Sequence, residues 1–239
     1  MKNEDIVRCG NIKKFSNFIK ENSLDDEALN IIVKDQNVEF FREYLKHHDL
    51  TNEQITQILS EKGVTLIMME LVRLVKKFNA RQQFLIVNKQ NAMLTEAYLF
   101  PDGFFDIKRR FYDEVETRYI ETMAQANKLV GLETFKAYVD NNYGRMIRSE
   151  VVLLLVKYPN SYATRYILHS GKIRKEFEAL FIDNASVELI KYYLEERQFC
   201  TDKGQMALIQ KSMELAEIHQ RKYGFFPNIH EKFFKMKHY

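Results

Sequence analysis

Glycine and proline are scarce in this sequence of 239 residues, which contains 8 glycines and 3 prolines. A β-sandwich or β-barrel needs many tight turns, and these two residue types supply much of the turn chemistry. Their scarcity therefore excludes a many-turned β fold. The long stretches between them are rich in leucine, isoleucine, lysine and glutamate, which predicts an all-α protein.

Cysteine is almost absent, since Cys9 and Cys200 are the only two and no CxxC pair occurs. A disulfide framework is excluded, and a reducing cytosol is the expected compartment. The longest apolar run is Val151–Val156, far short of the roughly 20 residues that span a bilayer. The first residues mix charged and apolar side chains and show no secretory pattern. We therefore expect a soluble cytoplasmic protein without a membrane span.

Motifs of catalysis and cofactor binding are missing as well. No P-loop, GxGxxG or GxSxG sequence occurs, and His230-Glu231 lacks the second histidine of HExxH. The six histidines are scattered, which argues against a metal site. The sequence therefore predicts a non-enzymatic protein with no cofactor and no bound metal.

Net charge is small, at +3, and it is unevenly placed. Segment 219–239 holds five cations and one carboxylate, a net +4, which leaves −1 for residues 1–218. A nearly neutral body does not hold nucleic acid through charge alone.

An internal repeat is what the sequence does contain. The stretches Ile31–Leu45, Ile58–Val72 and Leu85–Leu99 start 27 residues apart, and Leu180–Leu194 is a further copy. Each copy ends on a pair of large apolar residues, and these anchor pairs are spaced 26, 27, 27, 40, 28 and 27 residues apart. The anchor pairs are Phe18-Ile19, Tyr44-Leu45, Leu71-Val72, Tyr98-Leu99, Tyr138-Val139, Tyr166-Ile167 and Tyr193-Leu194. Self-similarity at a fixed period predicts a repeat architecture.

The pattern within each repeat predicts two short helices separated by a polar break. Thr51, with Gln54 three residues later, has the capping-box pattern that begins a helix. A helix of about ten residues is marginal alone in water, so each repeat must bury its apolar stripe against its neighbours. We expect the recurring tyrosine to be buried, with its hydroxyl bonded to a neighbouring carbonyl.

This pattern resembles the HEAT-like and ankyrin-like helical-repeat proteins, whose helix pairs stack into a superhelix. The period near 27 is shorter than theirs, and neither a TPLH motif nor any tryptophan is present. The resemblance therefore concerns architecture, over nearly the whole chain. It implies a right-handed αα-superhelix, or α-solenoid, of about seven short helix pairs in a single domain, 1–239, with a binding surface rather than an active site.

One long interval interrupts the repeat, as an insertion at 100–123 between repeats at 1–99 and 124–205. Phe104, Ile107, Phe111 and Val115 follow helical spacing there. An insertion in a solenoid often lies on the binding face, and its aromatic and basic side chains are suited to bases and phosphates. The alternative is an extra packed helix with solvated cations. The candidate binding residues of this segment are Phe105, Lys108, Arg109, Arg110 and Tyr112.

The C-terminal segment, about 206–239, is expected to cap the array. Gln205–Tyr223 predicts one long helix that Gly224 ends, and Asn228 predicts the N-cap of a last helix. The cations of that last helix form a second candidate binding set, for an acidic partner, nucleic acid or a membrane surface. They are Lys232, Lys235 and Lys237.

These observations favour a scaffold or interaction module that binds a protein partner, as a peptide or helix, along a groove between repeats. The rival function is nucleic-acid binding through the insertion and the basic tail. A third is a DNA glycosylase that acts through a groove carboxylate, to which the chain is similar in architecture only. The sequence does not indicate an oligomeric state.

Overall fold

The computed structural model describes residues 3–88, 91–101, 109–126 and 131–237. Helices make up 74% of the described residues, and no strand occurs among them. The prediction of an all-α protein is therefore confirmed. Within the same ranges, no helix combines the length and the apolar character that crossing a membrane requires.

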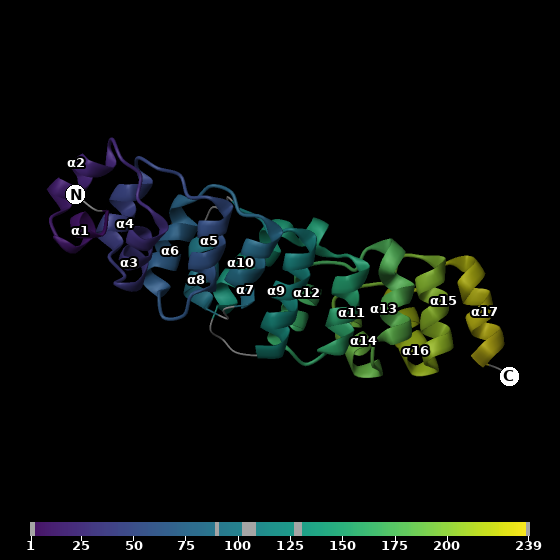
Figure 1. Ribbon diagram of the computed structural model, residues 1–239. Coiled ribbons are helices and arrows are strands. Elements are labelled where there is room, and N and C mark those ends of the chain that lie inside the picture. Colours follow the sequence, from purple (N-terminus) through teal and green to yellow (C-terminus); the bar gives the residue numbers. More distant parts are fainter. Residues whose placement is uncertain (1–2, 89–90, 102–108, 127–130, 238–239) are drawn as a thin grey trace. The chain divides into compact units, whose positions relative to one another are not determined.

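Seventeen α-helices and one short 3₁₀ helix lie in the described ranges (Figure 1). In chain order they are α1 Asn3–Arg8, α2 Ile12–Ile19, α3 Asp26–Lys34, α4 Val38–Leu45, α5 Asn52–Ser60, α6 Thr65–Leu74, α7 Ala80–Asn88, α8 Ala92–Leu99, α9 Asp113–Ala126, α10 Leu132–Met146, α11 Ser149–Lys157, α12 Tyr162–Ser170, η1 Lys175–Phe177, α13 Glu178–Asn184, α14 Val187–Leu194, α15 Asp202–Lys211, α16 Met213–Tyr223 and α17 Pro227–Lys237.

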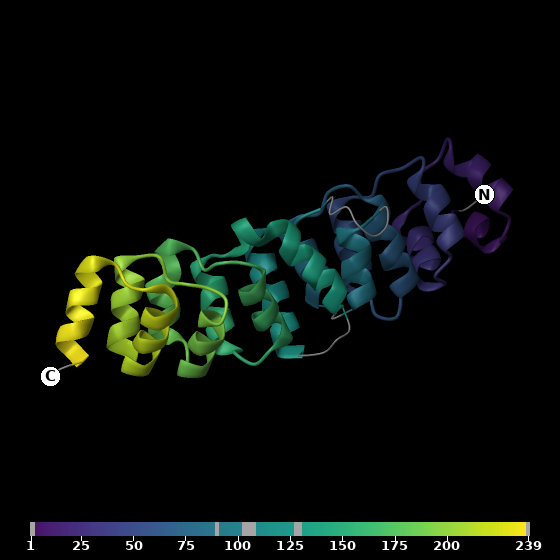
Figure 2. The same cartoon turned by 180° about the vertical axis from the view of Figure 1, so that it is seen from behind.

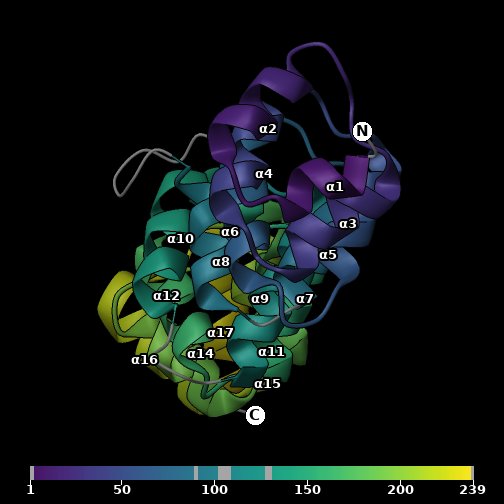
Figure 3. The same ribbon diagram turned by 60° about the vertical axis from the view of Figure 1, so that its left-hand side comes forward.

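The chain divides into two compact units, Met1–Val115 and Glu116–Tyr239. In the first unit the even-numbered helices form one row, because α2 packs on α4, α4 on α6 and α6 on α8 (Figure 3). In a second row α1 packs on α3 and α5 on α7, and consecutive helices pair across the two rows. In most of this unit, helices two places apart in the chain thus pack on one another.

The second unit follows the same rule. Helices α11, α13, α15 and α17 pack in succession, while α10 packs on α12 and α14 on α16. The last helix, α17, is yellow in Figure 2 and lies beside α15. It buries Ile229 and Phe233 in a cluster with Ile209 and Ala216. The prediction of a single domain over 1–239 stays a prediction.

The polar breaks of the repeat begin many of the helices. Thr51 and Gln54 form both bonds of the predicted capping box, at 3.2 and 3.0 Å. An N-cap side chain satisfies backbone N–H groups that the helix itself leaves unpaired. The N-cap residues whose side chains accept such a bond include Asn11, Asp25, Asn37, Asn91, Ser161, Ser186, Thr201 and Ser212.

Most residues of the anchor pairs are buried. The second residue of each pair is buried except Leu45, which is half-buried, and the first is buried except Phe18 and Tyr166. The tyrosine hydroxyls find partners, but a carbonyl is only one kind of partner. Tyr98 donates to the Arg110 carbonyl at 3.1 Å, whereas the Tyr193 hydroxyl accepts from the Ile173 N–H at 3.1 Å.

Hydrogen bonds between equivalent helices also follow the repeat. Ser16 donates to Glu43, 27 residues later, at 2.6 Å, and Tyr166 donates to Asp140, 26 residues earlier, at 2.9 Å. These separations equal one repeat length. The period seen in the sequence is therefore the separation of residues that lie side by side.

Three basic side chains bind a carbonyl near the C-terminus of a helix, 28 to 30 residues earlier in the chain. Arg174 donates to the Gly144 carbonyl of α10, and Arg197 donates to the His169 carbonyl of α12 at 2.7 Å. Lys222 donates to the Leu194 carbonyl of α14 at 3.0 Å. The last carbonyls of a helix have no intrahelical partner and carry partial negative charge, so a cation there stabilises the helix end.

The C-terminal segment differs from the sequence prediction in two places. The predicted long helix is two helices, because Ser212 ends α15 and its side chain accepts from the Leu215 N–H as the N-cap of α16. The last helix begins at Pro227 rather than after Asn228, whose side chain instead donates to Asp202 at 2.7 Å. Proline suits a first helical position because its missing N–H would be unpaired there anyway.

Buried His219 makes the stability of the second unit depend on pH. Its ring packs between Phe199 and Phe225, and its Nε2 accepts from the Phe199 N–H at 3.3 Å. Burial lowers the pKa of His219 to about 4, below the ordinary value near 6.5. The unfolded chain therefore binds more protons between these pH values, and stability falls as the pH falls through that window.

We expect the free energy of unfolding to drop by about 2 kcal/mol between pH 7 and pH 5 on account of His219. Urea unfolding at both pH values measures this loss. The variant His219→Gln retains an acceptor for the Phe199 N–H but does not titrate, so it should lack this part of the loss. An equal loss in the two proteins would contradict the assignment.

Candidate functional site

The cations that the sequence singled out in the insertion are placed very differently from one another. Arg109 is half-buried and donates to the Val72 carbonyl and, at 3.0 Å, to the Arg73 carbonyl. Its guanidinium lies 5.8 Å from the ring centre of Phe78 and 5.6 Å from that of Tyr98. Arg109 therefore bridges the end of α6 and two core rings, so its charge serves the fold of the first unit.

The other insertion residues are more exposed or lie elsewhere. Phe105 and Lys108 lie outside the described residues. Arg110 is exposed. Tyr112 is 51% exposed, and its backbone N–H donates to Gln83 Oε1 at 2.9 Å. The backbone from Arg109 to Tyr112 is not helical, since α9 begins at Asp113.

Two of the three cations of the C-terminal set make ion pairs. Lys235 pairs with Glu231 at 2.6 Å, and Lys237 pairs with Glu217 at 2.8 Å. Lys232 is exposed. These residues belong to the second unit and Arg109–Tyr112 to the first.

A broad concavity in the first unit was not singled out from the sequence. It lies where α4 and α6 end and α5 begins, and it measures about 1540 Å³ when space open to solvent is counted. We call it the basic groove. Its apolar lining is Leu45, Leu50, Ile55, Leu74 and Val75, and its polar lining is Arg42, Lys46, His48, Asp49, Asn52, Lys76 and Lys77.

Three of the groove's basic side chains are held by neighbours. Arg42 binds Glu70 through two bonds of 2.6 and 2.7 Å, which raise the pKa of Arg42 and lower that of Glu70. Lys46 pairs with Glu43 at 2.6 Å. His48 lies 2.5 Å from the Ile19 carbonyl and stacks on Tyr44.

Lys76 and Lys77 differ from these three, because both are exposed and neither makes an ion pair with a described residue. They follow the C-terminus of α6, whose partial negative charge favours cations. Leu74, beside them, is 47% exposed. The groove therefore offers two uncommitted positive charges next to an exposed aliphatic side chain.

A sequence signal for this groove existed. Residues 71–95 contain five cations and no carboxylate. In a chain whose net charge is only +3 such a run is a local excess, and it includes Lys76 and Lys77.

A second groove lies between α6 and α8. Its lining includes Met69 and Met93, and Met93 is 61% exposed. It measures about 730 Å³ with open space counted. Methionine side chains adapt to irregular apolar partners, so the lining of this second groove is deformable.

The buried carboxylates are bound by protein groups rather than aimed into a cleft. Glu116 pairs with Arg148 at 3.0 Å and accepts from the Tyr138 hydroxyl at 2.5 Å. Glu178 accepts from the N–H groups of Cys200 and Thr201 at 2.7 and 2.9 Å. Among the described residues, no three His, Cys, Asp or Glu side chains are grouped to hold a metal ion.

Comparison of this chain with protein-family models, with curated proteins and with solved structures gave no match.

Proposed function

We propose that the chain is a non-catalytic interaction module of the cytoplasm, built as an α-solenoid that resembles the HEAT-like and ankyrin-like proteins. The solenoid would be a right-handed superhelix of about seven helix pairs. In support, equivalent helices pack on one another within each unit, and side chains one repeat apart are hydrogen bonded. Solenoids of this kind bind partners along grooves between repeats.

The basic groove is the site that carries this proposal. An exposed leucine and an apolar lining favour an aliphatic side chain of the partner, while Lys76 and Lys77 favour carboxylates. The partner is therefore a peptide segment in which acidic residues flank leucine or a similar residue. The rival, nucleic-acid binding, has less support, because Arg109, Lys235 and Lys237 are engaged within the protein.

The test is a binding measurement with a fluorescent peptide that alternates two glutamates with one leucine. We expect Lys76→Glu combined with Lys77→Glu to weaken binding at least tenfold, because two attractive charges become repulsive. Lys13→Glu combined with Lys14→Glu is the matched control, since this adjacent exposed pair lies in α2, outside the basic groove. The control should bind within twofold of the unchanged protein.

A labelled single-stranded oligonucleotide, measured at low and at moderate salt, tests the rival. Tight binding that falls steeply with salt, together with no binding of the acidic peptide, would replace the proposed function with nucleic-acid binding. Equal loss in the two lysine double variants would show that the effect is one of overall charge, and it would reject the groove as the site.

A further inference from the structure

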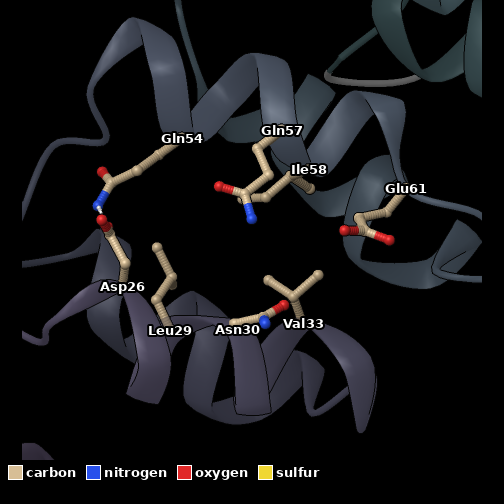
Figure 4. A pocket seen from close by; sticks show the side chains of 8 residues that line it. All are labelled: Asp26, Leu29, Asn30, Val33, Gln54, Gln57, Ile58 and Glu61. Carbon is tan, nitrogen blue, oxygen red and sulfur yellow. Dashed lines mark hydrogen bonds between the residues drawn. The ribbon is translucent and has the colours of Figure 1, made fainter.

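Polar side chains join helices of the first unit that lie one repeat apart. In the odd-numbered row, Gln54 of α5 donates to Asp26 of α3 at 2.8 Å (Figure 4). In the even-numbered row, Ser16 of α2 donates to Glu43 of α4 at 2.6 Å. Such a bond holds two successive repeats together at their surface.

The bond between α4 and α6 is an ion pair, in which Arg42 donates to Glu70 at 2.6 and 2.7 Å. Arg42 stands two residues before the anchor pair of its helix, and Glu70 stands one residue before its own. The hydrogen-bonded pair of α2 and α4 occupies the same two positions. At the next step, from α6 to α8, these positions hold Met69 and Ala97. Methionine and alanine side chains cannot form such a bond, so this step has no polar link there.

The surface of α6 and α8 is also apolar where that of α2 and α4 is charged. Leu66 and Met93, each five residues before the anchor pair of its helix, are 55% and 61% exposed. The equivalent residues of α2 and α4 are Lys13 and Glu39, which are exposed as well. Packing within the chain therefore does not account for the two apolar side chains. Exposed apolar residues that lie together mark an interaction site.

These differences occur at the second groove, which runs along both helices. Met69 and Arg73 line it from α6, and Met93 and Ala97 line it from α8. The two residues from each helix are four positions apart, so they lie on one face of that helix. Helix α6 has ten residues and is therefore about 15 Å long, which matches about three turns of a partner helix.

A helix suits this lining better than an extended peptide does. An extended peptide leaves its backbone N–H and C=O groups unpaired unless a sheet edge binds them. The backbone groups of α6 and α8 are bonded within these helices, and the groove offers mainly apolar side chains. A helix satisfies its own backbone groups and presents apolar side chains along one face.

The two charged residues of the second groove have opposite signs. Glu96 of α8 is half-buried and makes no ion pair with a described residue. Arg73 of α6 reaches Glu70 only at 3.5 Å, and Glu70 is already bound by Arg42. The second groove is therefore neutral overall. It favours a partner with a carboxylate on the α6 side and a cation on the α8 side.

We propose that the second groove binds an amphipathic helix of a partner protein, whose leucines or similar residues pack on Met69 and Met93. A glutamate beside this apolar stripe meets Arg73, and a lysine on its other side meets Glu96. Ala97 lets the partner helix approach α8 closely. The inference does not rest on the basic groove, whose lining shares no residue with that of the second groove.

The probe is a fluorescent peptide that a side-chain crosslink holds helical. Its leucines stand at i, i+3, i+4 and i+7, with glutamates on one side of them and lysines on the other. In the full chain, ¹³C-labelled methionine methyl groups report on Met69 and Met93 by NMR. We expect these two signals to shift and to saturate, while those of Met206 and Met213 in the second unit stay unchanged. A peptide of equal composition with its leucines spread around the helix should bind at least tenfold more weakly.

Met69→Arg combined with Ala97→Glu gives the α6–α8 step the ion pair of the α4–α6 step. Ala97 is 4% exposed and Glu70, at the equivalent position, is 7% exposed, so the new carboxylate meets similar burial. Peptide binding should fall at least tenfold, because charged side chains replace the apolar lining. Urea unfolding shows whether this double variant remains folded.

Met93→Glu is a second variant that leaves the core untouched, because Met93 is exposed. It puts at this position the residue type of Glu39, and it should weaken peptide binding at least fivefold. Leu153→Glu is the matched control, since Leu153 is another exposed apolar residue, 45% exposed in α11 of the second unit. The control should bind the peptide within twofold of the unchanged protein.

Equal binding of the two peptides, unchanged binding in the folded groove variants, or an equal loss in the control variant would overturn the proposal. Signals of Met69 and Met93 that move with protein concentration in the absence of peptide would make a second copy of the chain the occupant, and they would also overturn it. The double variant Lys76→Glu and Lys77→Glu should bind the helical peptide within twofold of the unchanged protein. A failure of the basic groove as a site is thereby distinguished from a failure of the second groove.

Discussion

Replacing Glu178 by alanine should lower the free energy of unfolding of the second unit by about 3 kcal/mol. Glu178 is 2% exposed, and its oxygens accept from the N–H groups of Cys200 and Thr201 and from the Thr201 hydroxyl at 2.6 Å. These groups precede and cap α15. The truncation would leave two backbone donors without an acceptor and remove a negative charge from a helix N-terminus.

Urea unfolding followed by circular dichroism measures this loss, and hydrogen exchange of α15 amides locates it. Glu176→Ala is the matched control, since the Glu176 side chain is 58% exposed and reaches Arg174 only at 3.7 Å. It should change stability by no more than about 0.5 kcal/mol. A similar loss in the two variants would mean that the bonds of Glu178 contribute little.

Gly204, in the first turn of α15, lies directly against the Glu178 side chain. A Cβ at this position would lie 2.6 Å from Glu178 Oε2 and 2.9 Å from Glu178 Cβ. Alanine at 204 would therefore push the carboxylate away from the start of α15. Combined with Glu178→Ala it should cost less than the sum of the two single changes, because the closer contact, with Oε2, is then absent and only the contact with the Cβ of residue 178 remains.

Tyr98→Ala should destabilise the first unit by about 4 kcal/mol, because it removes a large buried ring. Tyr98 is 3% exposed, stacks on Phe111 at 5.2 Å and meets the edge of Phe78 at 5.6 Å. Burial raises the pKa of its hydroxyl to about 12. The same ring also supports Arg109, so its loss would loosen the contact of Arg109 with the end of α6.

Urea unfolding measures this effect, with Tyr112→Ala as the control. Tyr112 lies 14 residues later in the sequence and is 51% exposed, so its truncation should change stability by no more than about 0.5 kcal/mol. Hydrogen exchange should show faster exchange of α6 and α8 amides in Tyr98→Ala. Unchanged exchange there would contradict the role given to this ring.

Much of the fold could be predicted from sequence because its information is local and repeated. A capping box such as Thr51 with Gln54 lies within four residues, and an anchor pair such as Tyr193-Leu194 recurs at one period. The break at Ser212 was missed because the apolar residues on both sides of it keep a helical pattern. There a serine side chain that accepts from Leu215 decides between one helix and two.

The candidate sites could be predicted far less well. Whether a basic side chain is available to a partner depends on intramolecular contacts with residues far away in the sequence. Lys235 with Glu231 is a pair four residues apart that the sequence displays. Lys237 with Glu217 and Arg109 with Val72 join residues 20 and 37 apart, and only packing brings them together. The number of basic residues in the sequence therefore overstates the positive charge that is free to interact with a partner.

The cations that close helix ends one repeat earlier have a consequence for the order of folding during synthesis. Arg174, Arg197 and Lys222 each stand 28 to 30 residues after the carbonyl they bind. The ribosome makes the helix first and its closing side chain later. Each of these helices would thus leave the ribosome with its last carbonyls unbound by the side chain. It would gain the stabilisation of that hydrogen bond only after the following 28 to 30 residues have left the exit tunnel.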